Sequence, residues 1–243
     1  MVRILQQDGE YVIKTSQVSL DEMLLNVEYA GRVCYQSESE NDIKTAENFV
    51  KMLVRRNHWS VVEHSLLTVH FNKISRGFTA EQNRHRLTSI SESSTRYIDF
   101  TRGKIDLNNS SIGVIAPPGK NVDKSVDISY VKDGKEINDT ISFREMASMI
   151  EGCYKGLRKN GWLPEEARQI LPLGLQTQEV ISTNWREWRH IMFMRTNKKA
   201  HWEIRELQCK LLSELMKMIP AVFDDFVLIG EDKRGIPYYE LKD

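Results

Sequence analysis

Apolar residues recur at helical spacing in two segments near the start of the sequence. In residues 20–37 they come at steps of three or four, as at Val27, Ala30 and Cys34. Residues 42–56 repeat the pattern. This period places the apolar side chains on one face of a helix, so two amphipathic helices are predicted.

A strand followed by a helix is predicted next. Leu67, Val69 and Phe71 alternate with polar residues, the period of a half-buried strand. Ser75 is placed to cap a helix that would carry FTAEQNRHR as far as Arg86.

The second half of the chain begins irregularly and then becomes helical. Residues 101–141 predict loops and a hairpin, with a turn signal at Asp133-Gly134. Further on, the pattern predicts a helix over 143–160, one or two helical turns over 165–171, a β-like segment after Pro172, and helices over 184–195 and 198–218. The fold class is α/β of the α+β type: helices around a mixed or antiparallel sheet, in one domain over residues 1–243.

Charge and cysteine content narrow the function. The 243 residues include 34 Lys and Arg and 34 Asp and Glu, so no overall field draws the protein to nucleic acid or to an anionic membrane. No apolar run suits a signal peptide or a membrane span, which predicts a cytoplasmic protein. The three cysteines form no CxxC pair, and we expect buried, reduced thiols.

The segment RHRLTSISESSTRY, residues 84–97, is the first candidate for chemistry. No GxGxxG or GxxxxGK[ST] loop occurs, so an anion would have to be bound by side chains. Arg84, Arg86 and Arg96 offer paired donors to phosphate, and the hydroxyls between them suit a ribose phosphate. Glu92 would stay ionised there and could accept from a sugar hydroxyl or an imide N–H.

A second cluster lies about a hundred residues further on. Arg186 and His190 are four apart and share a helix face, and Arg195 ends the same helix. The simpler interpretation is a mixed polar face whose last cation suits the helix dipole.

Other chemistries have less support. His58, His64 and His70 match no metal-binding spacing, so no metal site is predicted. Ser94 lies in no GxSxG elbow, and nothing indicates a thiol nucleophile.

Several motifs together resemble the flavin-dependent thymidylate synthases, the ThyX family. Arg-His-Arg, seven residues and then Ser94 resemble the family signature. NHWSVVEH and SRGFTAEQNRHR resemble the segments that precede it, and EEARQILPLGLQT, TNWREWRHIMFMR and AHWEIREL follow in family order. The resemblance covers about two thirds of the chain and is specific because its spacings are fixed.

The resemblance implies reductive methylation of dUMP to dTMP. The carbon would come from methylenetetrahydrofolate and the electrons from NADPH through bound FAD. It also implies a homotetramer with active sites shared between subunits, so that a basic patch could lie inside a neutral assembly.

The resemblance also assigns residues. Arg195 would favour ionisation of the uracil N3, which makes C5 nucleophilic. The FAD positions are His58, Ser60, Arg84, His85, Arg86, Glu92, Asn184, Arg186 and His190. The dUMP positions are Glu81, Gln82, Asn83, Arg84, Glu92, Ser93, Ser94, Thr95, Arg96, Arg168 and Arg195.

The chain departs from the family at Asn83, Ser91 and Thr95, which affects the details of nucleotide contact. Hydroxymethylation of a pyrimidine nucleotide would use nearly the same pocket. A different class, a nucleic-acid-binding module using Trp185 and Trp188, is opposed by the zero net charge. Flavin colour would separate the enzyme from the module.

Overall fold

The structure, a computed structural model, describes residues 2–102 and 111–242. The chain forms two compact units, each described here by itself. The first comprises residues 1–8, 73–77 and 92–178, and the second comprises residues 9–72, 78–91 and 179–243. Part of the predicted loop, residues 103–110, lies outside the described residues.

The second unit contains the two predicted N-terminal helices, α1 (Gln17–Tyr35) and α2 (Ile43–Arg55), which pack against each other. The side chains of Ser16 and Asp42 cap them by accepting from backbone N–H groups. Gly31 allows the close approach, since a Cβ there would lie 2.6 Å from the ring of Phe49. Both predicted helices are confirmed.

A four-stranded sheet runs in the order β2-β3-β8-β4. Its strands are β2 (Glu10–Ile13), β3 (Leu67–Ser75), β8 (Gln176–Thr183) and β4 (Ser89–Glu92). The predicted alternation in β3 is confirmed, since Leu67, Val69 and Phe71 are fully buried. The strand after Pro172 is confirmed as β8, whereas β4 arises in a segment where a loop was expected.

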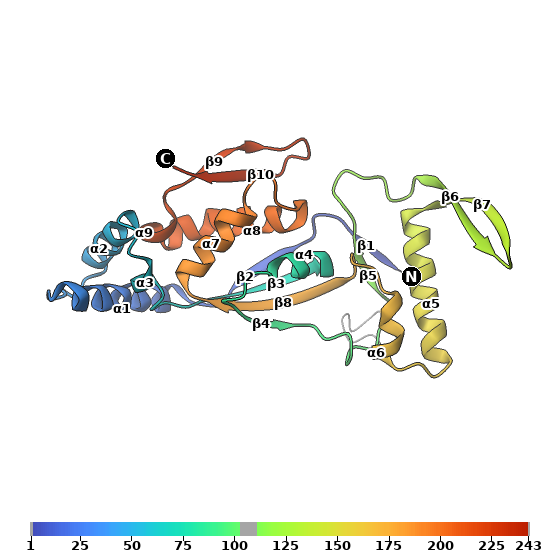
Figure 1. The fold of residues 1–243 in the computed structure, drawn as a ribbon, viewed down its shortest axis with the longest axis horizontal. Coiled ribbons are helices and arrows are strands. Elements are labelled where there is room, and N and C mark those ends of the chain that lie inside the picture. Colours follow the sequence, from blue (N-terminus) through green and yellow to red (C-terminus); the bar gives the residue numbers. More distant parts are fainter. Residues whose placement is uncertain (1, 103–110, 243) are drawn as a thin grey trace. The chain divides into compact units, whose positions relative to one another are not determined.

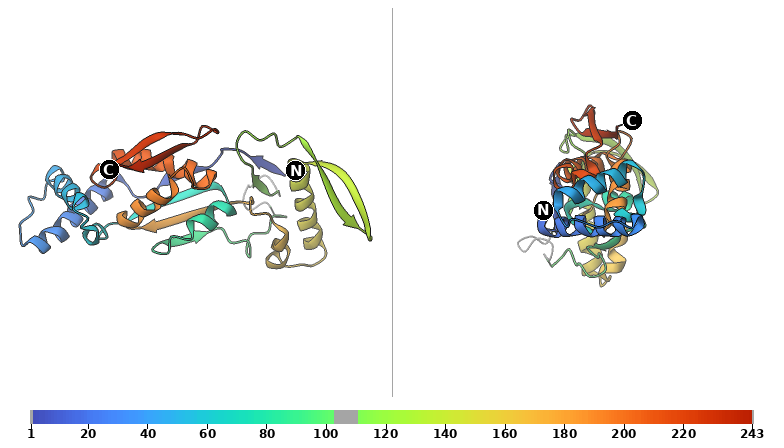
Figure 2. Two further views of the ribbon diagram at one scale, coloured as in Figure 1. Left: turned by 45° about the horizontal axis from the view of Figure 1, so that its top comes forward. Right: turned by 90° about the vertical axis from the view of Figure 1, so that its left-hand side faces the viewer.

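Helices α7 (Trp185–Arg195) and α8 (Trp202–Met218) cover one face of this sheet (Figures 1 and 2). The indole Nε1–H of Trp188 donates to the carbonyl of Leu67 at 2.9 Å, which joins α7 to β3. Both helices were predicted, although α8 begins four residues later than expected. The short helices α3 (Trp59–Val62) and α9 (Pro220–Phe223) and the antiparallel pair β9 (Phe226–Glu231) and β10 (Pro237–Leu241) complete the unit.

Helix α4 (Arg76–Gln82) is shorter than predicted. The chain leaves the helix after Gln82, whose side chain is buried against Gln208 at 3.0 Å. His85 turns into the interior while Arg84 and Arg86 remain exposed. Arg-His-Arg therefore lies in the turn after the helix and not within it.

The first unit packs around its own apolar core. The parallel pair β1 (Arg3–Leu5) and β5 (Gly113–Ile115) lies beside α5 (Phe143–Lys159), α6 (Pro164–Ala167) and a 3₁₀ turn (Arg168–Ile170). Ser142 and Glu145 form a reciprocal capping box at the start of α5. The predicted helix over 143–160 and the helical turns over 165–171 are confirmed.

The predicted hairpin consists of β6 (Ser125–Lys132) and β7 (Lys135–Ser142). Asp133 and Gly134 form the turn. Their φ values are 51° and 74°, and a two-residue hairpin turn of type I′ requires a positive φ at both positions.

The prediction of buried thiols is wrong for two of the three cysteines. All three thiols are free, but only Cys209 is buried, and Cys34 and Cys153 are exposed. Cys34 lies on the outward side of α1, where helical spacing alone could not distinguish a core position from a surface one.

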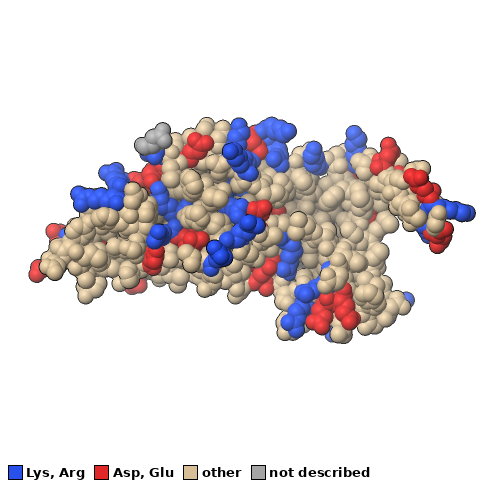
Figure 3. Space-filling model, viewed as in Figure 1, with Lys and Arg blue, Asp and Glu red and all other residues tan. Residues whose placement is uncertain are grey.

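Figure 3 shows basic and acidic side chains interspersed over the viewed face, in keeping with the zero net charge. Among the described residues, no helix combines the length and the apolar content needed to cross a membrane.

Candidate active site

Arg195 lies at the centre of a hydrogen-bond network in the second unit. Asn184 caps α7 by accepting from the backbone N–H of Glu187 at 2.8 Å, and Arg195 is the last residue of that helix. Its Nε donates to Nε2 of His85 at 3.0 Å, and its Nη1 and Nη2 donate to the carboxylate and the carbonyl of Glu81 at 2.6 and 2.7 Å. The guanidinium is thus fixed on two sides.

His85 is kept neutral in this network. Burial lowers its pKa to about 4, and the nearby Arg195 and His190 act in the same direction. Because Nε2 accepts from Arg195, the ring proton is assigned to Nδ1. Nδ1 lies 3.6 Å from the carboxylate of Glu187, whose own pKa is raised by burial.

The side chains of His85, Glu187 and His190 approach one another closely enough for a metal ion, with ligand atoms within 4.8 Å. The guanidinium of Arg195 at His85 would repel a second cation there. The sequence prediction that the protein has no metal site stays a prediction.

The two arginines that flank His85 differ from Arg195. Arg84 and Arg86 are exposed, and neither makes a hydrogen bond or ion pair within residues 2–102 and 111–242. Their donors are available to a ligand. Asn83 beside them is also exposed, whereas Gln82 presents no side chain to solvent.

Three predicted flavin positions line one hollow of about 460 Å³ in the second unit. His58, Ser60 and Arg186 reach it from α3 and α7, together with Cys34 and Tyr35. The hydroxyl of Tyr35 and Nδ1 of His58 lie 3.0 Å apart, and Arg186 forms an ion pair with Glu63. His190 is exposed one turn after Arg186.

The remaining predicted positions belong to the first unit. Glu92 pairs with Nη1 of Arg76 at 2.8 Å, and Arg76 also donates to the carbonyl of Ser93. Arg168 donates to the hydroxyl of Thr95 at 3.1 Å and has no acidic partner among the described residues.

Arg96 and Ser94 lie in the same segment of the first unit. Arg96 is exposed and forms an ion pair with Glu165 at 3.2 Å. The hydroxyl of Ser94 accepts from the backbone N–H of Arg96 at 3.3 Å. The hydroxyls of Ser94 and Thr95 and the guanidiniums of Arg96 and Arg168 thus belong to one short region of the first unit.

Sequence reasoning missed Arg76, Glu187 and Gln208, although each fixes a predicted residue. Arg76 could have been found, because it is part of the SRGFTAEQNRHR motif. The positions of Glu187 and Gln208 in the sequence do not single them out, and only the three-dimensional contact reveals their partners.

Residues 19–221 match the family described as "Thymidylate synthase complementing protein". Curated relatives named flavin-dependent thymidylate synthase, from Mycobacterium avium (strain 104) and Mycobacterium tuberculosis (strain H37Rv), are each 32% identical over 206 residues. In both cases the match covers 82% of this chain and 78% of the relative.

Two solved structures share the fold at lower identity. The UMP/dUMP methylase PolB from Streptomyces cacaoi, bound to 5-Br dUMP, is similar with a TM-score of 0.64 at 19% identity, covering 91% of this chain and 95% of that one. ThyX from Helicobacter pylori, complexed with FAD and dUMP, is similar with a TM-score of 0.60 at 19% identity, covering 88% and 99%. The α+β fold class is confirmed.

Proposed function

The chain belongs to the thymidylate synthase complementing protein family, and we propose that it catalyses the reductive methylation of dUMP to dTMP. In this reaction C5 of the uracil gains the methylene carbon of methylenetetrahydrofolate, tetrahydrofolate leaves, and two electrons from NADPH bring the carbon to a methyl group. The observation that carries the proposal is the family match over residues 19–221.

Arg195 is the proposed catalytic residue. Three of the five N–H groups of its guanidinium are used by His85 and Glu81, which leaves two donors for a ligand. A planar cation with donors in a fixed direction stabilises a uracil that has lost the N3 proton, and the charge makes C5 more nucleophilic. Neutral His85 positions this cation without adding a second charge.

FAD is the proposed cofactor, and the residues of the second unit fit it. Arg84 and Arg86 offer exposed guanidiniums that have no partner among the described residues, and these suit a diphosphate. The hollow at His58, Ser60 and Arg186 offers room beside a further cation. When bound, FAD supplies the hydride relay between NADPH and the transferred carbon. His85, Asn184 and His190 complete the proposed contacts in this unit, and Glu92 is proposed from the first.

The proposed dUMP contacts are named here for each unit by itself. From the second unit these are Glu81, Gln82, Asn83, Arg84 and Arg195, of which Gln82 is fully buried in this structure. From the first unit Arg168 has no acidic partner within residues 2–102 and 111–242, and this suits it to the 5′-phosphate. Glu92, Ser93, Ser94, Thr95 and Arg96 supply further hydrogen-bonding groups.

The proposed assembly is a homotetramer that shares active sites between subunits, with methylenetetrahydrofolate and NADPH as co-substrates. The reaction is proposed to take place in the cytoplasm without a nucleic acid or membrane partner. The equal numbers of acidic and basic side chains support this, because they give the chain no overall field toward a polyanion.

The test is a product assay on the purified protein. We expect flavin absorbance, NADPH oxidation that depends on dUMP, and dTMP formed only when methylenetetrahydrofolate is present. A colourless protein that binds oligonucleotides with a steep salt dependence would contradict the proposal. Mass analysis of the nucleotide product separates methylation from hydroxymethylation, and UMP in place of dUMP tests the choice of sugar.

A further inference from the structure

The β6–β7 hairpin of the first unit has one apolar face. Residues directly opposite each other in an antiparallel pair share a face, so the register of the hairpin sorts its side chains. One face is mostly polar and carries Asp127, Ser129 and Glu136. The other face carries the pairs Val126 with Ile141, Ile128 with Asp139, and Tyr130 with Ile137.

This apolar face is largely open. Val126 is 50% exposed and Tyr130 is 43% exposed, while Ile128 and Ile137 are half-buried. A hairpin of only two strands is marginally stable in water, because it has too little apolar surface of its own to bury. The apolar face is therefore suited to docking on a further surface.

The end of the same face is positively charged. Lys132 and Lys135 are direct partners at the turn and belong to the apolar side of the hairpin. Like charges placed opposite each other destabilise a strand pair. An anionic partner beside this end would remove the repulsion, so the surface that receives the hairpin should be apolar along its length and acidic at one end.

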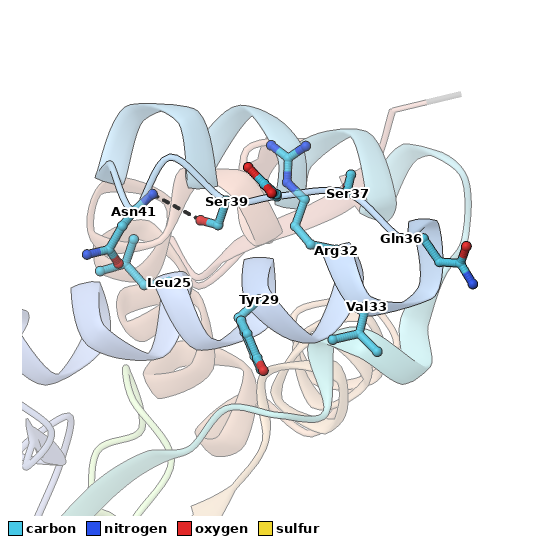
Figure 4. A pocket seen from close by; sticks show the side chains of 9 residues that line it. Leu25, Tyr29, Arg32, Val33, Gln36, Ser37, Ser39 and Asn41 are labelled. Atoms are coloured by element: carbon cyan, nitrogen blue, oxygen red, sulfur yellow. Dashed lines mark hydrogen bonds between the residues drawn. The ribbon is translucent and has the colours of Figure 1, made fainter.

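The second unit has a surface of this description on α1. Val18, Leu25, Tyr29 and Val33 follow one another at steps of seven and four, and Val18, Tyr29 and Val33 are between 62% and 67% exposed. Tyr29 and Val33 leave the same side of the helix (Figure 4).

The segment that follows α1 is acidic. Residues 37–42 carry Glu38, Glu40 and Asp42, all exposed. A hollow of about 540 Å³ lies between this segment and α1, lined in part by Leu25, Tyr29 and Glu38. Its apolar and acidic walls match the aromatic and cationic side chains near the turn of the hairpin.

The two surfaces also match in length. From Val18 to Val33 a helix rises about 22 Å. The eight residues of each hairpin strand span about 24 Å. Lysines at the end of one surface and carboxylates at the end of the other fix the direction in which they would meet.

We propose that the β6–β7 hairpin of one copy of this chain docks along α1 of a second copy, with its turn at the acidic segment 37–42. This names a contact within the proposed homotetramer and rests on that part of the proposed function. Tyr130 enters the hollow beside Tyr29, and Lys132 and Lys135 pair with Glu38 and Glu40. In a two-fold arrangement the contact occurs twice.

Two variants on neighbouring residues test the contact. Tyr130→Asp places a charge on the apolar face, and Val131→Asp places the same charge on the polar face at a side chain that is 74% exposed. We expect Tyr130→Asp to raise the dissociation constant of the assembly at least about tenfold, measured by sedimentation at several concentrations. Val131→Asp should change it less than about threefold, with circular dichroism checking that both fold. Equal effects of the two variants would overturn the proposal.

Crosslinking tests which chain receives the hairpin. In a background with Cys34→Ser and Cys153→Ser, one protein carries Tyr130→Cys and another carries Tyr29→Cys. After mixing and mild oxidation we expect a covalent two-chain product, at least about tenfold more than with Val131→Cys as the control. A yield no higher than with this control would overturn the proposal. So would a disulfide that forms only within one chain, in a protein that carries both Tyr29→Cys and Tyr130→Cys.

A charge exchange gives an independent readout. Lys132→Glu with Lys135→Glu should weaken the assembly, and adding Glu38→Lys with Glu40→Lys should restore it; a failure to restore would count against the contact. Measuring dTMP formation on the same samples separates the two proposals. Activity without the crosslink refutes only the docking contact, whereas a crosslinked assembly without activity refutes only the proposed reaction.

Discussion

Arg195 and the pair Arg84 and Arg86 belong to one unit but have opposite surroundings. Arg195 is 12% exposed and donates to His85 and twice to Glu81. Arg84 and Arg86 are exposed and make no hydrogen bond or ion pair within the part of the chain that the structure describes. The guanidinium of Arg195 is fixed before any ligand binds, whereas a bound ligand can order those of Arg84 and Arg86.

This difference separates two uses of arginine. A group that stabilises charge during a reaction works best when its position is set in advance, since no reorganisation is then needed at the moment of reaction. A group that binds a phosphate can remain mobile and lose its side-chain freedom on binding, at some loss of affinity. These surroundings support the proposal that Arg195 takes part in the chemistry and that Arg84 and Arg86 bind phosphate.

The largest expected effect is that of Arg195→Ala. Loss of a preorganised donor lowers kcat by about 10²–10³-fold in comparable sites. FAD content should be unchanged, because the proposed flavin cations are elsewhere. Arg195→Lys should recover little, since an ammonium keeps the charge but cannot reach His85 and Glu81 with one planar group. Steady-state kinetics with flavin absorbance measures both.

A purely structural role for Arg195 predicts another result. A cation that only interacts with the dipole at the end of α7 contributes about 0.3–1 kcal/mol to the free energy of unfolding. Wild-type turnover in a slightly destabilised Arg195→Ala protein would therefore contradict the catalytic assignment.

The sequence predicted the members of this network but not their contacts. Arg195 and His85 are 110 positions apart, and periodicity relates only residues within one element. Gln82 was assigned to the nucleotide by its place in a motif, yet its side chain is buried against Gln208. Motif spacing identifies which residues belong together, and packing decides which of their atoms face a ligand.

The second expected effect concerns His85 and the pH dependence of stability. Its pKa is lowered from 6.5 to about 4 in the folded protein, so between these values the unfolded chain binds more protons. The free energy of unfolding therefore falls as the pH drops from 6.5 towards 4, by up to about 3 kcal/mol from this residue. His85→Gln cannot titrate and should lose less stability over the same range.

Urea unfolding of both proteins at pH 7, 6, 5 and 4 measures this difference. His201 also has a lowered pKa owing to burial, but it is present in both proteins and cancels in the comparison. If the free energy of unfolding depends on pH identically in both proteins, His85 is not held neutral. The contrast between a preorganised Arg195 and the exposed Arg84 and Arg86 would then lose its support.

The third effect tests the exposed side of the comparison. Arg84→Ala or Arg86→Ala should weaken FAD binding by about 10- to 100-fold, the value of a hydrogen bond to a charged group. Thermal stability should hardly change, because neither side chain has a described partner to lose. Arg55→Ala, at an exposed arginine that ends α2, is the matched control and should retain FAD.

The elements that sequence predicted best are those with a strong period of their own. Helices α1, α2, α5 and α7 each follow a helical apolar pattern, and the Asp133-Gly134 turn fixes the hairpin. Strand β4 could not be predicted, because Ser89–Glu92 has no apolar alternation and joins the sheet only through its neighbour β8.

The smallest expected effect concerns Cys34, which lines the hollow proposed for the flavin. Replacing Cys34, Cys153 and Cys209 together by Ala should leave dTMP formation measurable, because burial raises the pKa of Cys209 to about 12 and no step of the proposed reaction uses a thiol. FAD should nevertheless slow the alkylation of Cys34 by covering it. Cys153 is exposed on α5 of the first unit and serves as the internal control, with an unchanged rate. Peptide mapping after timed maleimide labelling, with and without FAD, gives both rates in one experiment. Equal labelling of Cys34 in both conditions would contradict the proposed flavin contacts at His58, Ser60 and Arg186. Arg84 and Arg86 would then be the flavin's only proposed cationic contacts in this unit.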